Sequence, residues 1–302
     1  MMYVRAKKAL GQHFLKDEGI ASKIVESLIT KENENSDKDY HNDNQNNELK
    51  NTITDVLEIG PGTGVLTKYL LERSDIKLKV VELDSESVKY LRQNYPILSP
   101  YILQTNFLKM KLEKFFPGNF MIIGNFPYNI SSQIFFKILD YKDNVPQIVC
   151  MLQKEVAERI ASAPKSKAYG ILSVLLQAWY NIEYLFTVDS SVFLPPPKVQ
   201  SAVIRLKRNT RTSLNCDADL FKAVIKTCFN LRRKTIRNSI KPLILKNQAN
   251  DIPNISILDE SCFEFTFEKK VGHPETRNLL DMRPEQLSVE DFILFTQKLS
   301  TK

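Results

Sequence analysis

The sequence has few cysteines, few histidines and no long apolar run, and each shortage excludes a class of protein. The four cysteines lie far apart without CxxC spacing, which argues against a metal site or a disulfide framework and favours a reducing, cytoplasmic environment. No apolar run is long enough for a membrane-spanning helix, so no membrane partner is expected. The three histidines are scattered, so no catalytic cluster around a histidine is indicated. The positions are Cys150, Cys216, Cys228, Cys262, His13, His41 and His273.

The remaining composition is that of an ordinary globular protein, with 43% hydrophobic and 25% charged residues. A length of 302 residues predicts one large domain with a smaller one attached. The 42 lysines and arginines outnumber the 35 acidic residues and give a net charge of +7. This charge suggests a polyanionic partner, although many enzymes that bind no polyanion are equally basic.

From Asp55 onward, short apolar runs alternate with amphipathic stretches. This alternation predicts a largely parallel sheet with helices on both faces, in the Rossmann-like manner. A strand pair around residues 184–188 and 201–206 is expected to close one edge of the sheet. We therefore predict an α/β catalytic domain over residues 1–208. Within it, the almost wholly polar stretch 31–51 cannot bury a core and is expected to be a disordered insertion.

After Arg208 the pattern becomes helical, and residues 209–302 are predicted to form a small helical domain that binds RNA. Between residues 222 and 241 basic side chains recur and no acidic residue occurs, which indicates contact with phosphates. A solvated surface helix is the alternative interpretation. The candidate RNA-binding residues are Lys222, Lys226, Arg232, Arg233, Lys234, Arg237 and Lys241.

The segment Val56–Leu70 places Gly60, Gly62 and Gly64 at a predicted strand-to-helix turn, where the backbone can approach a ligand closely. The GxGxG spacing and the proline inside it disfavour a dinucleotide cradle. Glu82 ends the next predicted strand, and its carboxylate can accept hydrogen bonds from both hydroxyls of a ribose. The combination predicts a nucleoside site.

Two further side chains are candidates for the same site. Glu58 precedes the turn and is a candidate to hold a cationic end of the ligand, directly or through water. Asn106 follows the third strand, at the edge of the sheet where ligands bind, and is a candidate to hydrogen-bond an adenine. A turn-forming role for Asn106 is an equally good interpretation.

The fourth predicted strand runs directly into Asn125, Phe126, Pro127 and Tyr128. An exocyclic amine of adenine is a poor nucleophile because its lone pair is delocalised into the ring. The Asn125 side-chain oxygen and the Phe126 carbonyl are two acceptors that favour a more tetrahedral nitrogen in line with a methyl donor. Pro127 stiffens the loop, and Tyr128 can stack on the base. No general base is required, because the methylated amine is acidic enough to lose its proton to water.

A second proline-rich segment, Phe193–Ser201, precedes the last predicted strand. Its prolines make a stiff loop that is able to present Phe193 to the target base. A rigid connector without contact to the base is the other interpretation.

These motifs together resemble the ribosomal RNA adenine dimethyltransferases, and the resemblance covers nearly the whole chain. They are Leu10–Leu15, Glu58–Gly64, Gly124–Tyr128, Phe193–Ser201 and Phe229–Thr235. The resemblance implies a class I S-adenosylmethionine-dependent methyltransferase that dimethylates two adjacent adenosines near the 3′ end of 16S rRNA in the immature small ribosomal subunit. It also implies cofactor contacts from His13, Leu15, Gly60, Glu82, Asn106 and Asn125.

Two departures from the family pattern are the polar insertion at 31–51 and Asn106, where the family usually has aspartate. The alternatives are a 23S rRNA adenine methyltransferase of the macrolide-resistance type and a non-catalytic ribosome assembly factor. The basic helical domain and the Phe193–Ser201 segment favour the small-subunit enzyme. A monomer is expected, because no heptad pattern or other assembly signature is present.

Overall fold

The computed structural model describes residues 4–30, 53–249, 263–267 and 275–299. The predicted insertion at 31–51 lies outside the described residues. The chain divides into two compact units, one formed by residues 1–157 and 181–208 and the other by residues 158–180 and 209–302. The second unit thus takes in residues 158–180, which the predicted boundary at 208 assigned to the catalytic domain.

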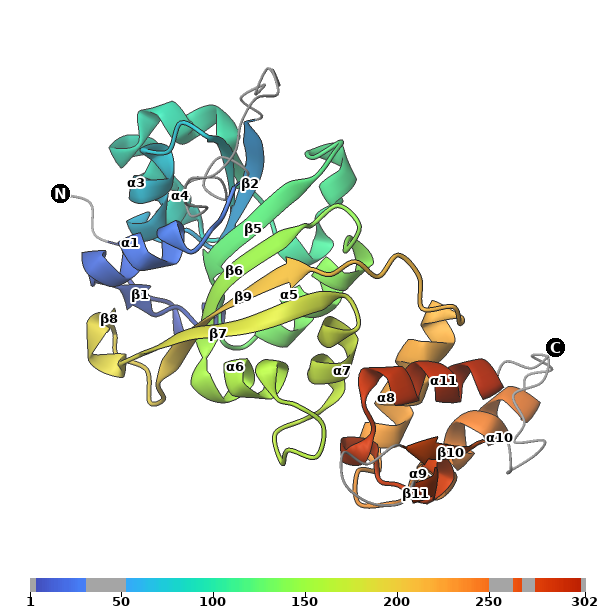
Figure 1. The fold of residues 1–302 in the computed structure, drawn as a ribbon. Helices are drawn as coiled ribbons and strands as arrows, with labels where there is room; N and C mark the ends of the chain where they lie inside the picture. The colour runs from blue at the N-terminus through green and yellow to red at the C-terminus, as the bar shows by residue number, and fades with distance from the viewer. Residues whose placement is uncertain (1–3, 31–52, 250–262, 268–274, 300–302) are drawn as a thin grey trace, which may run out of the picture. The chain divides into compact units, whose positions relative to one another are not determined.

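The first unit contains a seven-stranded sheet in the order β4-β3-β2-β5-β6-β9-β7 (Figure 1). The five strands from β4 to β6 run parallel, and β9 pairs antiparallel with β6. The predicted parallel sheet with two late strands at one edge is therefore confirmed. The strands are β2 (Thr54–Ile59), β3 (Ile76–Glu82), β4 (Ile102–Gln104), β5 (Phe120–Asn125), β6 (Gln147–Gln153), β7 (Tyr180–Val188) and β9 (Ser201–Arg208).

Helices pack on this sheet through their apolar faces. Ile24, Leu70 and Leu91 on three of these helices share one buried cluster with Val56 and Val80 of the sheet. Burial of such side chains contributes about 1.5–3 kcal/mol each, so this cluster stabilises the packing of these helices on the sheet. The helices are α1 (Glu18–Glu26), α3 (Val65–Leu71), α4 (Ser85–Asn94), α5 (Ser131–Asp140) and α6 (Lys154–Ala161).

A short antiparallel pair links the start of the chain to the proline-rich segment. β1 (Phe14–Leu15) pairs with β8 (Phe193–Leu194), so that Leu15 lies opposite Phe193. Short 3-10 turns complete the connections: η1 (Lys8–Leu10), η2 (Pro96–Tyr101), η3 (Phe107–Lys109), η4 (Leu112–Lys114), η5 (Ser190–Val192), η7 (Leu279–Asp281) and η8 (Pro284–Gln286).

The second unit is mainly helical and has its own aromatic core. The ring of Phe229 contacts those of Tyr169 and Phe292, with centroids 6.0 and 5.8 Å apart. Tyr169 therefore explains why residues 158–180 join this unit. Its elements are α7 (Ile171–Gln177), α8 (Ala218–Asn230), α9 (Ile236–Ser239), α10 (Lys241–Ala249), β10 (Glu264–Phe267), β11 (Glu275–Asn278) and α11 (Val289–Leu299). Among the described residues, no helix is both long and apolar enough to cross a bilayer.

Candidate active site

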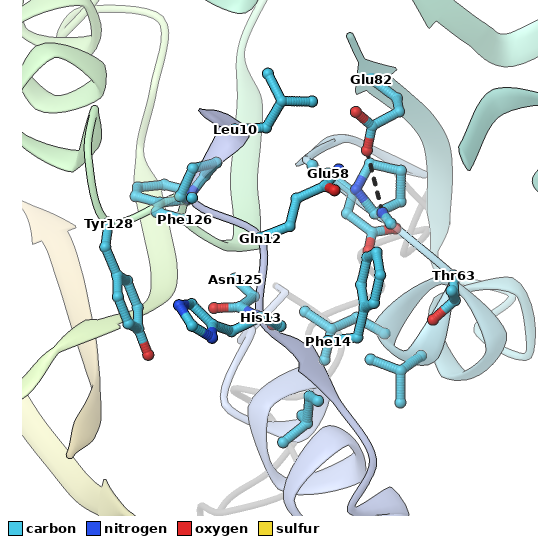
Figure 2. Close-up of a pocket in the computed structure, with 18 of the residues that line it drawn as sticks. Leu10, Gln12, His13, Phe14, Glu58, Thr63, Glu82, Asn125, Phe126 and Tyr128 are labelled. Atoms are coloured by element: carbon cyan, nitrogen blue, oxygen red, sulfur yellow. Dashed lines mark hydrogen bonds between the residues drawn. The ribbon is translucent and has the colours of Figure 1, made fainter. Parts of the chain in front are cut away.

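A pocket lies at the carboxyl edge of the sheet in the first unit, where β2, β3 and β5 end (Figure 2). Parallel strands bring their carboxyl ends together, so side chains that are distant in sequence meet there. An N-terminal segment, residues 10–15, forms another part of the lining. The lining residues used below are Gln12, His13, Phe14, Leu15, Glu58, Gly60, Gly62, Glu82, Leu83, Asn125, Phe126, Pro127 and Tyr128.

The turn between β2 and α3 depends on glycine for its conformation and for space. Gly60, Gly62 and Gly64 have φ angles of 67°, 56° and 82°, in the left-handed region that other residues rarely adopt. A Cβ atom on Gly62 would lie 2.8 Å from Cε1 of Phe14. The turn therefore brings bare backbone to the pocket wall, as predicted from the glycine spacing.

Glu82 ends β3 with its carboxylate held by backbone N–H groups. Its Oε1 accepts hydrogen bonds from Leu83 and Asp84 at 2.7 and 2.8 Å, and its Oε2 accepts one from Gly62 at 3.2 Å. Burial raises the pKa of Glu82, while these N–H groups oppose the shift. The bonds fix the carboxylate, and a carboxylate has about four acceptor positions, so capacity remains for a ligand hydroxyl.

Glu58 is a buried carboxyl group, and among the described residues it has one side-chain hydrogen-bond partner. It is 1% exposed, and the Thr67 hydroxyl donates a hydrogen bond to its Oε2 at 2.6 Å. Burial raises the pKa of Glu58 to about 8, the Thr67 bond opposes this rise, and the Glu82 charge adds to it. A buried acid of this kind is suited to a cationic ligand, which would stabilise its ionised form.

Asn125 is the last residue of β5, and its side-chain amide is oriented by the N-terminal segment. Its Nδ2 donates a hydrogen bond to the His13 carbonyl at 3.0 Å. Because Nδ2 is engaged there, Oδ1 is the end of the carboxamide left to accept from a ligand. The neighbouring Phe126 lines the pocket but is fully buried, and its ring packs against that of Phe135 with centroids 5.7 Å apart.

Tyr128 lies at the opposite side of Asn125 from the glycine turn (Figure 2). Its hydroxyl is hydrogen-bonded to the Ser201 hydroxyl, and burial raises its pKa. Its ring stacks on that of His13, with centroids 5.3 Å apart and planes inclined by 26°. An aromatic ring is therefore present next to Asn125, where base stacking was predicted.

Several contacts hold the N-terminal segment, together with the residues just before it, across the pocket. Lys7 forms ion pairs with Asp84 and Glu86, and His13 Nδ1 lies 2.8 Å from the Pro195 carbonyl. Leu15 is 4% exposed and joins the core cluster. His13 and Leu15 thus line the pocket, and their contact with a cofactor, which the family resemblance implies, stays a prediction.

Two predicted site residues lie elsewhere. Asn106 caps η3 by accepting a hydrogen bond from the Leu108 N–H at 2.9 Å, and it does not line the pocket. Its contact with a cofactor stays a prediction.

Phe193 is 1% exposed and packs in the core cluster, so its ring is not presented to a base as expected. The reason is strand alternation in β8, which turns Phe193 inward and leaves Leu194 44% exposed.

Sequence reasoning missed Gln12 and Phe14, although both belong to the quoted N-terminal motif. Gln12 Nε2 lies 3.5 Å from Asp84 Oδ2, and the Phe14 ring packs over Gly62. A glycine that tolerates no side chain indicates a bulky neighbour, but the sequence does not say which residue this is. The position of β1 over the turn identifies the neighbour as Phe14.

The candidate RNA-binding residues all belong to the second unit, in α8, in the segment between α8 and α9, in α9 and at the start of α10. Lys226, Arg233, Lys234 and Lys241 are exposed. The basic face is less uniform than predicted, because acidic residues from later in the chain approach it. Arg232 pairs with Glu285 at 3.5 Å, and Arg237 pairs with Asp281 at 3.1 Å.

Residues 3–263 match the model of the family described as ribosomal RNA adenine dimethylase. The chain belongs to this family. A protein of Parabacteroides distasonis, named ribosomal RNA small subunit methyltransferase A, is 52% identical over 98% of this chain and 94% of its own length. A protein of the same name from Cytophaga hutchinsonii is 46% identical over the whole of both chains.

Solved structures share the dimethylase fold. A dimethyladenosine transferase from Plasmodium falciparum superposes with a TM-score of 0.67 at 23% identity, covering 93% of this chain and 95% of that one. The 23S rRNA methyltransferase ErmE gives a TM-score of 0.56 at 24% identity, covering 95% and 100%. At these identities the two structures support the fold alone.

The dimethylase family implies S-adenosylmethionine as methyl donor, and the pocket residues fit that molecule. Glu82 offers a fixed, buried carboxylate for ribose hydroxyls, and the glycine turn brings backbone close without Cβ atoms. Glu58 offers a buried acid with a raised pKa, which suits a cationic sulfonium or ammonium group. The chemical character of the donor set therefore agrees with the cofactor.

Proposed function

We propose that this protein transfers methyl groups from S-adenosylmethionine to N6 of two adjacent adenosines in the 3′-terminal hairpin of 16S rRNA. The products are N6,N6-dimethyladenosines, formed during assembly of the small ribosomal subunit. The observation that carries the proposal is the Asn125–Tyr128 segment beside the nucleoside pocket, in a chain that matches the dimethylase family over most of its length. Relatives named for the small subunit match nearly the full chain.

Asn125 and Phe126 orient the reacting amine. The Asn125 Oδ1 and the Phe126 carbonyl accept hydrogen bonds from the two N6 hydrogens, which localises the lone pair on nitrogen and directs it toward the methyl group. The His13 carbonyl holds the Asn125 amide in the orientation that this requires. Pro127 stiffens the loop, and Tyr128 supplies a ring for the base.

The cofactor side of the pocket uses residues that are already fixed in position. Glu82 binds the ribose hydroxyls, Gly60 allows close backbone approach, and Glu58 balances the positive charge. S-adenosylmethionine supplies an electrophilic methyl group when bound. The released proton passes from N6 to water in this proposal.

The second unit provides phosphate contacts in this proposal. Arg233, Lys234 and Lys241 are exposed and carry no ion pair to any residue that the structure describes. Arginine and lysine at such positions bind the RNA backbone in a salt-dependent manner without reading sequence. A monomer acting in the cytoplasm stays a prediction.

Methyl transfer to three substrates tests the proposal. Labelled methyl groups from S-adenosylmethionine are offered with immature small subunits, mature small subunits and 23S rRNA, using the wild type and Asn125→Ala. We expect transfer to immature small subunits by the wild type and a large loss for the variant. Transfer to 23S rRNA alone would support the macrolide-resistance type instead, and binding without transfer would leave an assembly factor.

A further inference from the structure

Two buried carboxyl groups, those of Glu58 and Glu82, line the same pocket from the neighbouring strands β2 and β3 (Figure 2). Glu58 is 1% exposed and Glu82 is 6% exposed. Two negative charges with so little solvation oppose each other, and the Glu82 charge raises the pKa of Glu58. The hydrogen bonds that each acid accepts therefore decide which of the two is ionised in the free protein.

The two acids differ in the donors that they receive. Glu82 accepts three hydrogen bonds from backbone N–H groups. Glu58 accepts one from the Thr67 hydroxyl, at 2.6 Å, and no other from the residues that the structure describes. Donors of this kind stabilise the charged form of a carboxyl group. Glu82 is therefore the ionised member of the pair, whereas Glu58, whose pKa burial raises to about 8, retains its proton at neutral pH.

Thr67 lies on α3, the helix that begins after the glycine turn, and it is 0% exposed. It does not line the pocket, so its hydroxyl reaches Glu58 from within the protein. The hydrogen bond lowers the pKa of Glu58 and so opposes the effect of burial. Thr67 thus holds Oε2 of the carboxyl group and sets how readily Glu58 loses its proton.

The groups around Glu58 provide no positive charge to balance it. The other titratable groups that act on Glu58 or share its pocket lining are Glu82 on β3, Tyr95 after α4, Tyr128 after β5 and His13 on the N-terminal segment. No lysine or arginine among the described residues forms an ion pair with Glu58. A charge that holds Glu58 in its ionised form therefore comes from a ligand.

We propose that Thr67 positions Glu58 as a counter-charge that releases its proton to solvent when S-adenosylmethionine binds. This inference rests on the proposed function, because it takes the cationic cofactor as the ligand. The free pocket then carries one negative charge, on Glu82, and the occupied pocket carries two. Thr67 is a positioning residue, since it touches Glu58 and not the ligand.

Release of a proton makes the affinity for the cofactor depend on pH. Below pH 8 most of the free protein carries a proton on Glu58, and only the ionised fraction is competent to balance the cofactor's charge. The affinity is therefore expected to fall by roughly 10-fold or more between pH 7.5 and pH 6. Above pH 8 the ionised form prevails before binding, and the affinity should level off.

Calorimetry of S-adenosylmethionine binding in buffers of different ionisation enthalpy counts the protons released. The full chain should release about one proton from Glu58 at pH 6.5 and only a small fraction at pH 9. Glu58→Gln cannot ionise, so subtracting its proton count removes the protons that the cofactor itself exchanges. The difference between the wild type and this variant is the contribution of Glu58.

Variants of Thr67 test its positioning role. Thr67→Val keeps the bulk without the hydroxyl, and Thr67→Ala removes the same hydroxyl should valine not be accommodated. Either should lower the affinity roughly 10-fold at pH 7.5 and extend proton release to pH 9, because the ionised form of Glu58 loses its only described donor. Thr67→Ser keeps the hydroxyl and should restore both values.

Thr296→Val is the matched control, because it also removes a fully buried hydroxyl, one that donates to the Phe292 carbonyl in α11. Its affinity and proton count should equal those of the wild type. Urea unfolding at pH 5, where Glu58 is protonated with or without Thr67, verifies that each variant is folded.

The outcomes separate this inference from the proposed function. If the wild type binds no S-adenosylmethionine between pH 6 and pH 9, the proposed function fails. If the wild type binds it but releases no more protons than Glu58→Gln, the counter-charge is overturned and the proposed function stands. Wild-type behaviour of Thr67→Val or Thr67→Ala, or a loss in Thr67→Ser as large as theirs, would overturn the role of the Thr67 hydroxyl.

Discussion

The Asn125 carboxamide has two ends that differ in chemistry. The His13 carbonyl accepts a hydrogen bond from Nδ2, so Oδ1 is the end that would meet the target amine in the proposed reaction. A carboxylate at this position has no hydrogen to donate to that carbonyl and would repel it. Asn125→Asp is therefore expected to lower the single-turnover rate of methyl transfer by roughly 100-fold or more, the usual cost of a lost positioned hydrogen bond in an active site.

Asn129→Asp is the control for that prediction. Asn129 is exposed, and its Nδ2 also lies near the N-terminal segment, 3.4 Å from the Ala9 carbonyl. Its substitution should leave the rate near that of the wild type. Equal losses in the two variants would contradict the orienting role of His13 and assign the effect to a loosened N-terminal segment.

Glu58 makes the stability of the protein depend on pH. Its pKa rises from 4.5 to about 8 in the folded protein, chiefly through burial, so the folded state binds a proton between these values that the unfolded state has lost. The associated stability is fully present below about pH 4.5 and is lost as pH rises through 8. Each difference of one in the pKa between the folded and unfolded states corresponds to about 1.4 kcal/mol of folding free energy.

Urea unfolding at pH 5, 6.5 and 8 checks this dependence. Glu58→Gln cannot ionise, so it should reduce the decline in the free energy of unfolding between pH 5 and 8 by more than about 1 kcal/mol. Glu72→Gln, on an exposed carboxylate, should retain the decline. The assignment to Glu58 is wrong if both variants show the same pH profile as the wild type.

At the scale of elements, the turn between β2 and α3 and the strand β1 fit each other closely. Gly62 has a φ of 56°, and a Cβ there would lie 2.8 Å from Phe14. Gly62→Ala should destabilise the protein by about 1–3 kcal/mol from the backbone conformation alone, with an added cost from the contact with Phe14. The free energy of unfolding in denaturant measures the sum of the backbone cost and the cost of the contact with Phe14.

Phe14→Ala provides the partner for a double-mutant cycle. The Gly62→Ala and Phe14→Ala changes should be less harmful together than the sum of the two single changes, because the smaller residue removes the clash. Gly118→Ala has no atom within 4 Å of its added Cβ and is the control. Strictly additive effects would mean that Phe14 does not press on the turn.

The exposed basic residues just before α9 are expected to contact RNA phosphates. Arg233→Glu with Lys234→Glu should weaken RNA binding and reduce the slope of log affinity against log salt by about 1–2, because each lost phosphate contact removes about one released counterion. Filter binding across a salt series measures this slope. Lys89→Glu with Arg92→Glu on α4 changes the net charge equally and should alter the slope less. Unchanged binding by the first variant would contradict the RNA role.

The elements that the sequence predicted well are those set by local patterns. Alternating apolar runs predicted the parallel sheet, and the glycine spacing predicted the turn beside the pocket. The burial of Phe193 was not predictable, because it follows from the pairing of two short strands, β1 and β8, that lie far apart in the chain. The pairing of Arg232 with Glu285 was missed for the same reason.

Asn106 illustrates a different limit on sequence reasoning. The sequence left two interpretations open, a turn and an adenine contact. The hydrogen bond from the Leu108 N–H shows that Asn106 caps a turn, and the adenine contact stays a prediction. A short polar side chain at a strand end serves either purpose equally well. Position along the chain therefore does not distinguish a cap from a ligand contact.

At the scale of the whole molecule, the family match spans residues 3–263 and so includes sequence from both compact units. The first unit contains the pocket and the Asn125–Tyr128 segment, and the second contains the exposed basic residues. The second unit also includes residues 158–180, whose Tyr169 packs on Phe229. A truncation at residue 208 would therefore expose the Tyr169 side of that aromatic core.

The central claim concerns the position of the methyl groups in RNA. The most direct measurement is a map of adenosine methylation at single-nucleotide resolution on total ribosomal RNA, after the purified protein has acted with S-adenosylmethionine on immature small subunits mixed with 23S rRNA. The account predicts two adjacent N6,N6-dimethyladenosines in the 3′-terminal hairpin of 16S rRNA and no other new modification. Methylation confined to 23S rRNA, or no methylation at all, would contradict it.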